Sequence, residues 1–278
     1  MRTRFAPSPT GPLHLGHAYS ALIAYEMAQA AGGAFLLRIE DIDQSRARPA
    51  WEAQIYDDLA WLGLGWPQPV MRQSERLEAY RDALQRLWDG GLLYPCTCKR
   101  RDILEAASAP QEGAPAHGPD GVVYPGTCRA KPRPTQMPVD TALRLDMRKA
   151  VKAAVIFKET GPEHHGTITT TPAQFRDDIG DIVLARRDMG TSYHLAVAVD
   201  DAAQGITDVV RGADLFEATP IHVLLQRLLG LPTPRYHHHA LIRDEAGKRL
   251  AKRDDARAIA TYRDEGLAPA DIRALIGL

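Results

Sequence analysis

The stretch Arg4–His17 reads RFAPSPTGPLHLGH, and it decides the fold of this chain. It begins as a short apolar strand at Arg4–Pro7, breaks on prolines and a glycine, and is followed by an amphipathic helix expected from about Ala18 to Ala31. A strand, a tight turn and a helix in that order direct backbone N–H groups and the positive helix end towards an anion. The sequence therefore predicts an anion site at this turn.

Two histidines stand at the end of the stretch, His14 and His17, three residues apart. On the first turn of the helix they would share a face. Two imidazoles placed there can donate hydrogen bonds to a triphosphate and to the charge that develops when its α-phosphate is attacked. Gly16 would let an adenine ring lie on the backbone. Taken alone, a His-x-x-His pair at a helix start is more often a surface or structural feature, so the wider sequence has to decide.

The first 95 residues alternate between strand and helix patterns. Gly32-Gly33 is a suitable end for the first helix, and Ala34–Ile39 is expected to be a strand. Amphipathic helices are expected at Pro49–Leu62 and Ser74–Asp89. Helices between strands imply a parallel sheet with helices on its faces, so we predict an α/β fold.

Regular patterns return in the second half of the chain. Asp181–Arg186 and Thr207–Arg211 are expected to be strands, and Tyr193–Val199 is a near-continuous apolar run typical of a central parallel strand. Asp200 and Asp201 would then close that strand at its carboxyl end, where ligands bind in open α/β sheets. A helix, a strand and two short helices are expected after it, at Pro220–Leu229, Ala240–Ile242, Ala256–Tyr262 and Pro269–Ile276.

Between Pro95 and about Thr171 the composition changes to dense Pro, Gly and Ala without long periodic segments. We read this part as an inserted, loop-rich module with short strands near Ala142–Asp146 and Val155–Lys158, stabilised by something other than a core. Residues 96–152 carry ten Lys and Arg against six Asp and Glu. This excess is either a solvated face or a basic flank that faces RNA phosphates.

The three cysteines of the chain, Cys96, Cys98 and Cys128, all fall in this module. An odd, small number argues against a disulfide scaffold, and thiolates at this spacing suit one structural zinc ion in a closed tetrahedral site. Three thiols need a fourth ligand, and from chemistry alone His117 is the preferred candidate. The run His237–His239 is internal, and we expect one of its imidazoles to pack below the loop that follows rather than to bind metal.

The bulk numbers describe an ordinary soluble protein. The 278 residues carry a formal net charge of −1, so contact with a nucleic acid must come from local patches. No apolar run approaches the roughly 20 residues of a membrane span, and the N-terminus lacks a signal-peptide pattern. We therefore expect a cytoplasmic protein with no membrane partner, and we take it to be a monomer.

A second signature lies far downstream, in Lys248–Arg253 (KRLAKR). Alone, a basic loop is most often a solvated face. Together with the turn at His14–His17, it resembles the HIGH and KMSKS signatures of class I aminoacyl-tRNA synthetases. The prefix of the opening stretch, Arg38–Asp43 and Val209–Asp214 narrow the resemblance to the glutamyl branch, and the match spreads from residue 4 to residue 253.

The resemblance implies a Rossmann-like catalytic domain that binds ATP with Mg²⁺. His14, His17 and Lys252 match its catalytic positions, and Gly16 and Arg249 join them in the ATP site. The family pattern has Lys at the first and Ser at the third position of the second signature, where this chain has Arg249 and Ala251. The charge is retained, but a hydroxyl is lost.

The resemblance also implies a pocket for L-glutamate. Arg4 and Arg211 match the arginines of that pocket, and guanidinium forks suit carboxylates. Glu40 is a natural partner for the substrate ammonium, although Glu40–Asp43 also reads as a helix-capping acidic cluster. The complete set of matching positions is Arg4, Phe5, Ala6, Pro7, Ser8, Glu40, Tyr193 and Arg211.

The module and the C-terminus point to one subfamily. Tyr124–Cys128 looks like the Tyr-x-x-x-Cys pattern of glutamyl-queuosine tRNA(Asp) synthetases, which implies a zinc site of Cys96, Cys98, Tyr124 and Cys128, with His117 as the alternative ligand. Only 25 residues follow Arg253, too few for an anticodon-binding domain. We expect catalytic halves at 1–94 and 179–235, the module at 95–178, and the signature loop with short helices at 236–278.

Members of that subfamily activate glutamate with ATP without needing tRNA and transfer it to queuosine at the wobble position of tRNA(Asp). The expected partners are therefore glutamate, ATP and the anticodon stem-loop of that tRNA. Three alternatives stay open: a truncated glutamyl-tRNA synthetase that charges the acceptor end, a small HIGH-type nucleotidyltransferase, and a catalytically silent paralogue that only binds tRNA.

Overall fold

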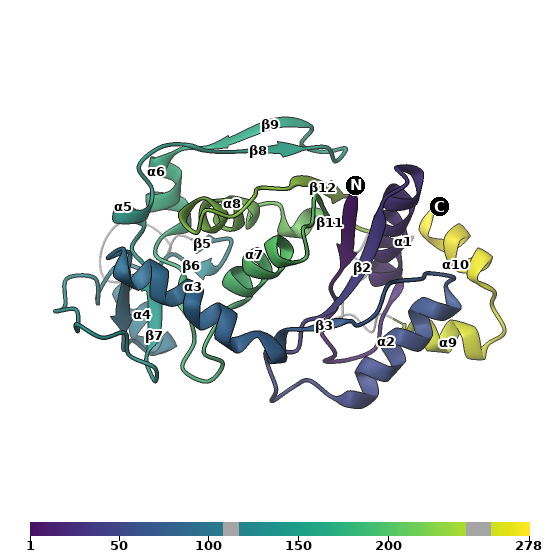
Figure 1. Cartoon of the computed structure of the whole chain (residues 1–278), viewed down its shortest axis with the longest axis horizontal. Helices are drawn as coiled ribbons and strands as arrows, with labels where there is room; N and C mark the ends of the chain where they lie inside the picture. Colours follow the sequence, from purple (N-terminus) through teal and green to yellow (C-terminus); the bar gives the residue numbers. More distant parts are fainter. Residues whose placement is uncertain (108–116, 243–256) are drawn as a thin grey trace.

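A computed structural model describes residues 1–107, 117–242 and 257–278 of the chain (Figure 1). Parallel strands form its centre: β1 (Arg2–Phe5), β2 (Ala34–Ile39), β3 (Met71–Arg72), β8 (Val155–Glu159), β11 (Asp208–Gly212) and β12 (Arg235–His239). β2 pairs with β1 and β3, and β12 pairs with β11 and β8, all in parallel. The Thr207 backbone N–H donates to the Arg2 carbonyl at 3.0 Å, which brings β11 beside β1. The predicted α/β fold with a parallel sheet is confirmed.

Helices cover the strands on both faces. They are α1 (Leu15–Ala30), α2 (Pro49–Trp61), α3 (Leu77–Asp89), α7 (Tyr193–Ala203), α8 (Thr219–Leu228), α9 (Ile259–Asp264) and α10 (Pro269–Ile276). α1 packs on β1, β2 and β11, while α7 packs against α3 and α8. Successive strand residues point to opposite faces, so Val209 of β11 belongs to the core around α7 and α8, whereas Val210 belongs to the core around α1.

The strand predicted at Tyr193–Val199 is wrong, because these residues form the first turns of α7. Ser192 caps the helix by accepting a hydrogen bond from the Leu195 backbone N–H. The helix lies between α3 and α8, and most of its residues are buried. Burial on several sides leaves the first turns of α7 without a polar face, and a short apolar run of this kind cannot be told from a buried strand by its pattern.

The strand predicted at Ala240–Ile242 is displaced, because β12 ends at His239. The histidine run forms most of this strand and pairs with β11 in register, with His238 opposite Arg211. The strand therefore carries two buried imidazoles, those of His238 and His239. The pattern of apolar residues instead predicted the strand just after them, at Ala240–Ile242. The expectation that one of these histidines packs at the base of the signature loop cannot be followed further, since residues 243–256 lie outside the described chain.

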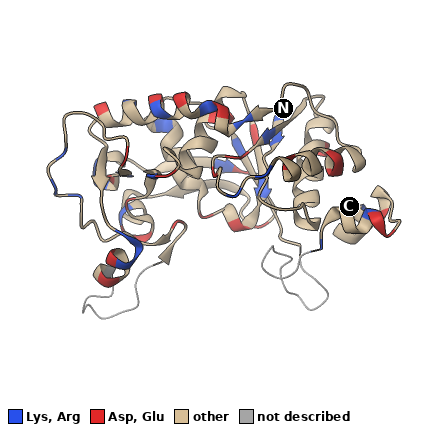
Figure 2. Ribbon diagram, turned by 90° about the horizontal axis from the view of Figure 1, so that it is seen from below, with Lys and Arg blue, Asp and Glu red and all other residues tan. Residues whose placement is uncertain are grey.

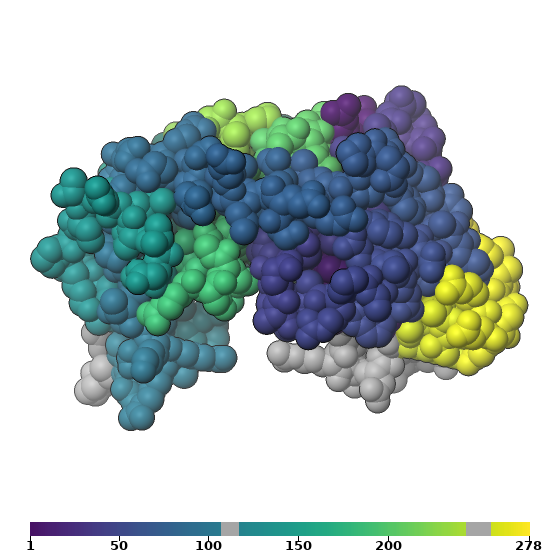
Figure 3. Space-filling model, turned by 60° about the horizontal axis from the view of Figure 1, so that its bottom comes forward, coloured from purple at the N-terminus to yellow at the C-terminus, as the bar shows by residue number. Residues whose placement is uncertain are grey.

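The C-terminal helices lie at one end of the molecule, and the middle of the chain forms a lobe, here called the middle lobe, at the other end (Figure 3). The middle lobe shares one apolar core with α3, α7 and α8. Its elements are β4 (Leu93–Cys96), α4 (Arg100–Ala107), β5 (His117–Gly118), β6 (Gly121–Val122), β7 (Ala142–Leu145), α5 (Met147–Ala150), α6 (Pro172–Gln174) and β10 (Val183–Ala185). β8 and β9 (Gly166–Thr170) fall inside the predicted module range but join β12 and β11 in one sheet. The domain limits therefore stay a prediction.

Acidic and basic residues are interspersed along the ribbon, and both kinds occur in the central strands (Figure 2). No helix in the described part of the chain is long and apolar enough to cross a membrane. The C-terminal segment returns to the opening stretch, because the Ile259 backbone N–H donates to the Leu13 carbonyl at 2.8 Å. α10 packs on α1, and Arg273 forms an ion pair with Glu26 there.

Candidate active site

A cavity of about 530 Å³ opens where β1, β2, β11 and β12 end. This is the edge of the sheet at which open α/β folds bind ligands. Eleven residues singled out from the sequence line it together: Arg4, Phe5, Ala6, Pro7, Ser8, His14, Gly16, His17, Glu40, Tyr193 and Arg211. Arg249 and Lys252, predicted for the ATP site, lie outside the described residues.

The two histidines of the opening stretch are held by the backbone of the helix start. His14 is the N-cap of α1, and its Nδ1 accepts a hydrogen bond from the Gly16 N–H at 3.1 Å. The His17 Nδ1 accepts from the His14 N–H at 3.2 Å, and the two ring centroids lie 3.8 Å apart. Because Nδ1 is an acceptor in both rings, each neutral imidazole carries its proton on Nε2.

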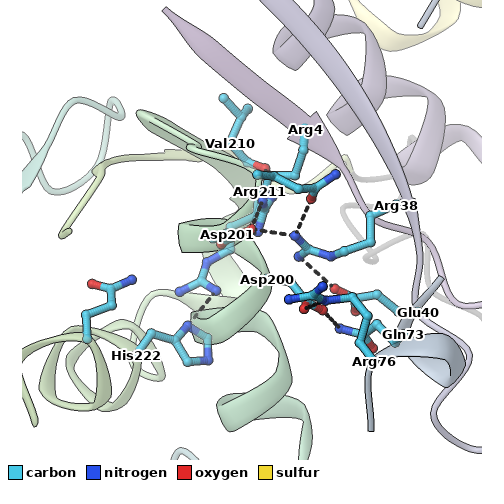
Figure 4. Close-up of polar contacts among 12 residues, drawn as sticks. Arg4, Arg38, Glu40, Gln73, Arg76, Asp200, Asp201, Val210, Arg211 and His222 are labelled. Atoms are coloured by element: carbon cyan, nitrogen blue, oxygen red, sulfur yellow. Dashed lines mark hydrogen bonds and ion pairs between the residues drawn. The ribbon is translucent and has the colours of Figure 1, made fainter. Parts of the chain in front are cut away.

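A buried ion network supports the floor of the cavity (Figure 4). Asp201 accepts hydrogen bonds from Arg4 Nε at 2.9 Å and from Arg38 Nη1 at 2.7 Å. Arg38 also donates to Glu40 Oε1 at 3.1 Å. Arg38 is fully buried and thus links the side chains of Asp201 and Glu40.

Burial raises the pKa of Glu40, although the positive charges of Arg38 and Arg4 act in the opposite direction. Burial also acts to raise the pKa of Asp201, but Arg4 and Arg38 outweigh it and hold this pKa below its usual value. Asp201 is therefore an anion inside the protein, and it keeps two guanidinium groups paired beside the cavity.

Asp200, predicted at the carboxyl end of a strand, instead lies in the last turns of α7 and faces away from the cavity. Its carboxylate accepts from Gln73 Nε2 at 3.0 Å, from Arg76 Nε at 2.6 Å and from the Tyr80 hydroxyl at 2.7 Å. These contacts tie α7 to α3 and to the turn before it. Of the adjacent pair, Asp201 alone touches a residue of the cavity wall.

Arg211 lies at the end of β11 and beside the network, because Arg4 Nη1 donates to the carbonyl of the preceding residue, Val210, at 3.3 Å (Figure 4). Its Nε donates to His238 Nε2 at 3.1 Å, and its Nη1 to His222 Nδ1 at 3.0 Å. Its Nη2 donates to the Thr219 hydroxyl at 2.7 Å. Tyr193 adjoins this group, with its ring centroid 5.6 Å from that of His222, and burial raises the pKa of its hydroxyl.

The three cysteines meet in the middle lobe. Their sulfur atoms lie within 4.8 Å of one another, and Cys98 Sγ is 3.4 Å from Cys128 Sγ. The Tyr124 hydroxyl oxygen lies 3.5 Å from Cys96 Sγ and 3.4 Å from Cys98 Sγ. This brings together the four residues predicted as metal ligands. His117, the alternative ligand, is on β5 and does not belong to the cysteine group among the described residues.

The cluster has the chemistry of a closed metal site. Cys96, Cys128 and Tyr124 are buried, and three sulfur donors with one oxygen donor complete a set of four. Burial acts to raise the pKa of the Cys128 thiol, but hydrogen bonds from Tyr124, Thr97 and Cys98 lower it to about 6. The Arg144 guanidinium lies 3.9 Å above the Tyr124 ring, and its Nε donates to Cys96 Sγ at 3.3 Å.

A scan against models of protein families matches residues 1–278 to the catalytic domain of class I tRNA synthetases, E and Q. The chain belongs to this family. It is therefore an enzyme of the aminoacyl-tRNA synthetase kind, a ligase, and the cavity at the strand ends is the candidate active site of a class I synthetase.

The chain is similar to curated class I relatives along its whole length. It is 68% identical over 280 residues to a protein of Rhodobacter capsulatus named glutamyl-Q tRNA(Asp) synthetase, with 100% of both chains covered. A Geobacter sulfurreducens protein of the same name is 44% identical over 262 residues, which cover 94% of this chain and 78% of the relative.

Solved structures of this class give the same fold. A glutamate tRNA ligase from Elizabethkingia meningosepticum, in complex with its amino acid, matches with a TM-score of 0.78 at 28% identity. The match covers 99% of this chain and 60% of that one. Mycobacterium tuberculosis methionyl-tRNA synthetase bound by methionyl-adenylate matches with a TM-score of 0.62 at 11% identity, which shows the shared class I fold alone.

Some residues of this class I site gave no signal in the sequence. His222 stands in an apolar helix and reads as an ordinary core residue, and Arg38 stands inside a quoted motif without an assigned role. Both become visible only when distant segments meet. Cavity residues that were not singled out are Thr10, Ser20, Val210, Gly212, Asp214, Leu215, His239, Leu241 and Ile242.

Proposed function

We propose that this protein activates L-glutamate with ATP, without needing tRNA, and transfers the glutamyl group to queuosine at the wobble position of tRNA(Asp). Full-length identity of 68% to a glutamyl-Q tRNA(Asp) synthetase carries the proposal. The names of the relatives favour this acceptor over the terminal adenosine of tRNA(Glu) and over a protein that only binds RNA.

The charges around the cavity suit glutamate. The ligand has two carboxylates and one ammonium, and the cavity wall offers two buried guanidinium groups, Arg4 and Arg211, and one buried carboxyl, Glu40. Guanidinium N–H groups match carboxylate oxygens, and Glu40 pairs with the ammonium. Arg38 holds Glu40 in place for this role. Phe5, Ala6, Pro7, Ser8 and Tyr193 would form the remaining wall of the glutamate pocket.

The turn at the start of α1 suits the phosphates of ATP. His14 and His17 carry their protons on Nε2 because both Nδ1 atoms accept from the backbone, so each ring has a donor for a phosphate oxygen. The glutamate carboxylate attacks the α-phosphorus in line, and pyrophosphate leaves. A queuosine hydroxyl then attacks the acyl carbon of the glutamyl-adenylate, loses its proton and displaces AMP. Mg²⁺ would accompany ATP, held mainly by phosphates and water.

We further propose that Cys96, Cys98, Tyr124 and Cys128 hold one structural zinc ion. Three buried sulfur atoms and a phenol oxygen gathered at short distances support this assignment. A zinc ion there would cross-link β4 to the loop that contains Tyr124 and Cys128, in a lobe with few long elements. We also propose that the protein acts as a cytoplasmic monomer and binds the anticodon stem-loop of its tRNA.

Glutamate-dependent exchange of pyrophosphate into ATP tests the first step. We expect exchange with L-glutamate in the absence of any tRNA, and little with L-glutamine or L-aspartate. Arg211→Lys, which keeps the charge but loses the planar guanidinium, is expected to reduce kcat/KM for glutamate at least tenfold. Exchange that requires tRNA, or that is equal for glutamine, would overturn the proposed activation step.

A further inference from the structure

The guanidinium of Arg211 is almost completely engaged by the protein. Nε and Nη1 each donate to an imidazole nitrogen, and Nη2 donates to the Thr219 hydroxyl and to the Leu215 carbonyl at 3.3 Å. A guanidinium has five N–H bonds and no acceptor. Contacts with the described residues therefore use four of them and leave a single N–H, on Nη1.

Because Arg211 is only a donor, each imidazole nitrogen that faces it must be unprotonated and accept through its lone pair. His222 then carries its proton on Nε2, which lies 3.0 Å from His194 Nδ1. His194 Nδ1 is therefore an acceptor as well, and the His194 Nε2–H faces Asp120 Oδ1 at 3.4 Å. The hydrogen bonds run in one direction, from the guanidinium through two imidazoles to a carboxylate between β5 and β6.

The second imidazole follows the same logic. His238 Nε2 accepts from Arg211, so its proton is on Nδ1, which lies 2.5 Å from Glu159 Oε2. The other oxygen of Glu159 accepts from the backbone N–H groups of His238 at 2.9 Å and Gly161 at 2.7 Å. Glu159 is 2% exposed. Each imidazole at the arginine thus has its tautomer set by a chain that ends on a carboxylate.

Burial, together with the neighbouring positive charge of Arg211, holds the pKa of His222 well below its usual value. Burial also lowers the pKa of His238, although Glu159 acts to raise it. Both rings are therefore neutral near pH 7, as acceptance from a guanidinium requires.

We propose that His222 and His238 are positioning residues for the amino-acid pocket: two lone pairs fix the plane of the Arg211 guanidinium and leave one Nη1–H for a substrate carboxylate. This rests on the proposed function, in which Arg211 binds glutamate. Asp120 acts further out, as the acceptor that sets the tautomers of His194 and His222. The middle lobe thereby contributes to the glutamate pocket through a hydrogen-bond chain (Figure 4 shows its first link).

Two substitutions of His222 separate positioning from packing. The Asn oxygen can replace the Nδ1 lone pair, so His222→Asn keeps the acceptor, whereas His222→Leu has similar bulk and no acceptor. KM for glutamate, KM for ATP and kcat are measured by pyrophosphate exchange. We expect His222→Leu to raise the glutamate KM ten- to a hundredfold, with the ATP KM within twofold. His222→Asn should stay within about threefold of wild type for both.

Asp120 gives a second pair that leaves the core untouched, in case His222→Leu does not fold. Asp120→Ala removes the terminal acceptor and should raise the glutamate KM two- to fivefold, whereas Asp120→Asn keeps an oxygen and should change it less than twofold. The proposal is overturned if His222→Leu and His222→Asn have equal KM values for glutamate. If His222→Leu is insoluble, equal KM values for Asp120→Ala and Asp120→Asn overturn it. A wild-type protein without glutamate-dependent exchange would instead refute the proposed function, and this inference with it.

Discussion

At the scale of single residues, the charge balance beside the cavity depends on Asp201. Two buried guanidinium groups share its carboxylate, and one of them, Arg38, also donates a hydrogen bond to Glu40. Two positive charges this close would repel one another without the carboxylate between them. The side chain therefore both allows Arg4 to line the cavity and fixes the orientation of its guanidinium.

Replacing Asp201 by Asn should reduce the free energy of unfolding by about 3 kcal/mol, since it leaves buried Arg4 without a counter-charge and Arg38 with Glu40 alone. Urea unfolding followed by circular dichroism measures the change. The matched control is Asp43→Asn, because Asp43 pairs with Arg46 at the surface and exposed pairs contribute little. A loss for Asp201→Asn no larger than that of the control would contradict the assigned role.

The buried histidines predict how stability changes with pH. The folded state holds the pKa of His222 well below its usual value, while the unfolded chain binds a proton below about pH 6.5. The unfolded state thus binds more protons as the pH falls, and stability declines from pH 7.5 to 5.5. One such group contributes at most about 1.4 kcal/mol per pH unit below its unfolded pKa.

His222→Asn removes one of these groups, so the decline should be shallower in the variant. Urea unfolding at the two pH values tests this. The decline should not vanish, because the pKa values of His237, His238 and His239 are also lowered by burial and act in the same direction. Equal declines in wild type and variant would show that His222 is protonated in the folded protein.

Most residues of the cavity could be predicted from the sequence because they stand in contiguous motifs. The stretch from Arg4 to His17 supplies nine of the twenty lining residues, and the ends of β2 and β11 carry Glu40 and Arg211. His222 could not be predicted, because an imidazole inside a buried helix gives no pattern. Its role depends on its hydrogen bond with Arg211 of β11, not on its neighbours in the chain.

At the scale of elements, α7 is where sequence and structure disagree most. Its apolar run suits a strand, and the helix is specified instead by its cap and by packing against α3 and α8. In the helix Asp200 and Asp201 continue directly from the run, and their side chains point to different neighbours because successive helical residues lie about 100° apart around the axis. One of them then supports Arg4, and the other ties α7 to α3.

The cap of α7 should therefore be measurable. Ser192→Ala removes the acceptor for the Leu195 N–H and should cost about 1 kcal/mol of stability. Ser192→Thr keeps a hydroxyl and should cost less than half of that. Thermal unfolding compares the two, and equal losses would indicate that the cap hydrogen bond does not stabilise the helix.

The cysteine cluster, which we propose to bind zinc, predicts a clear ranking of two variants. Tyr124→Phe removes the oxygen donor and should weaken zinc binding at least tenfold, as judged by competition with a chelator. His117→Ala should leave zinc binding unchanged, because His117 lies outside the cysteine group. Loss of zinc from the His117 variant alone would reverse the assignment of the fourth ligand.

At the scale of the whole molecule, β11 divides two cores and carries the arginine that faces the cavity. The layered α/β arrangement could be predicted, because alternating helix and strand patterns imply it. The placement of β8 and β9 could not: they lie beyond a long irregular segment, and strand pairing with β12 depends on residues more than 70 positions away. Periodicity reports which face of an element is buried, but not which distant strand lies beside it.

Transfer of labelled glutamate to tRNA(Asp), with and without queuosine, tests the central claim most directly. Both tRNA preparations lack the terminal adenosine, so that the ordinary acceptor hydroxyl is missing. We predict stable label on the queuosine-containing tRNA, dependent on ATP, and none on the tRNA without queuosine. Label that appears only when the terminal adenosine is restored, whether or not queuosine is present, would contradict the proposed acceptor.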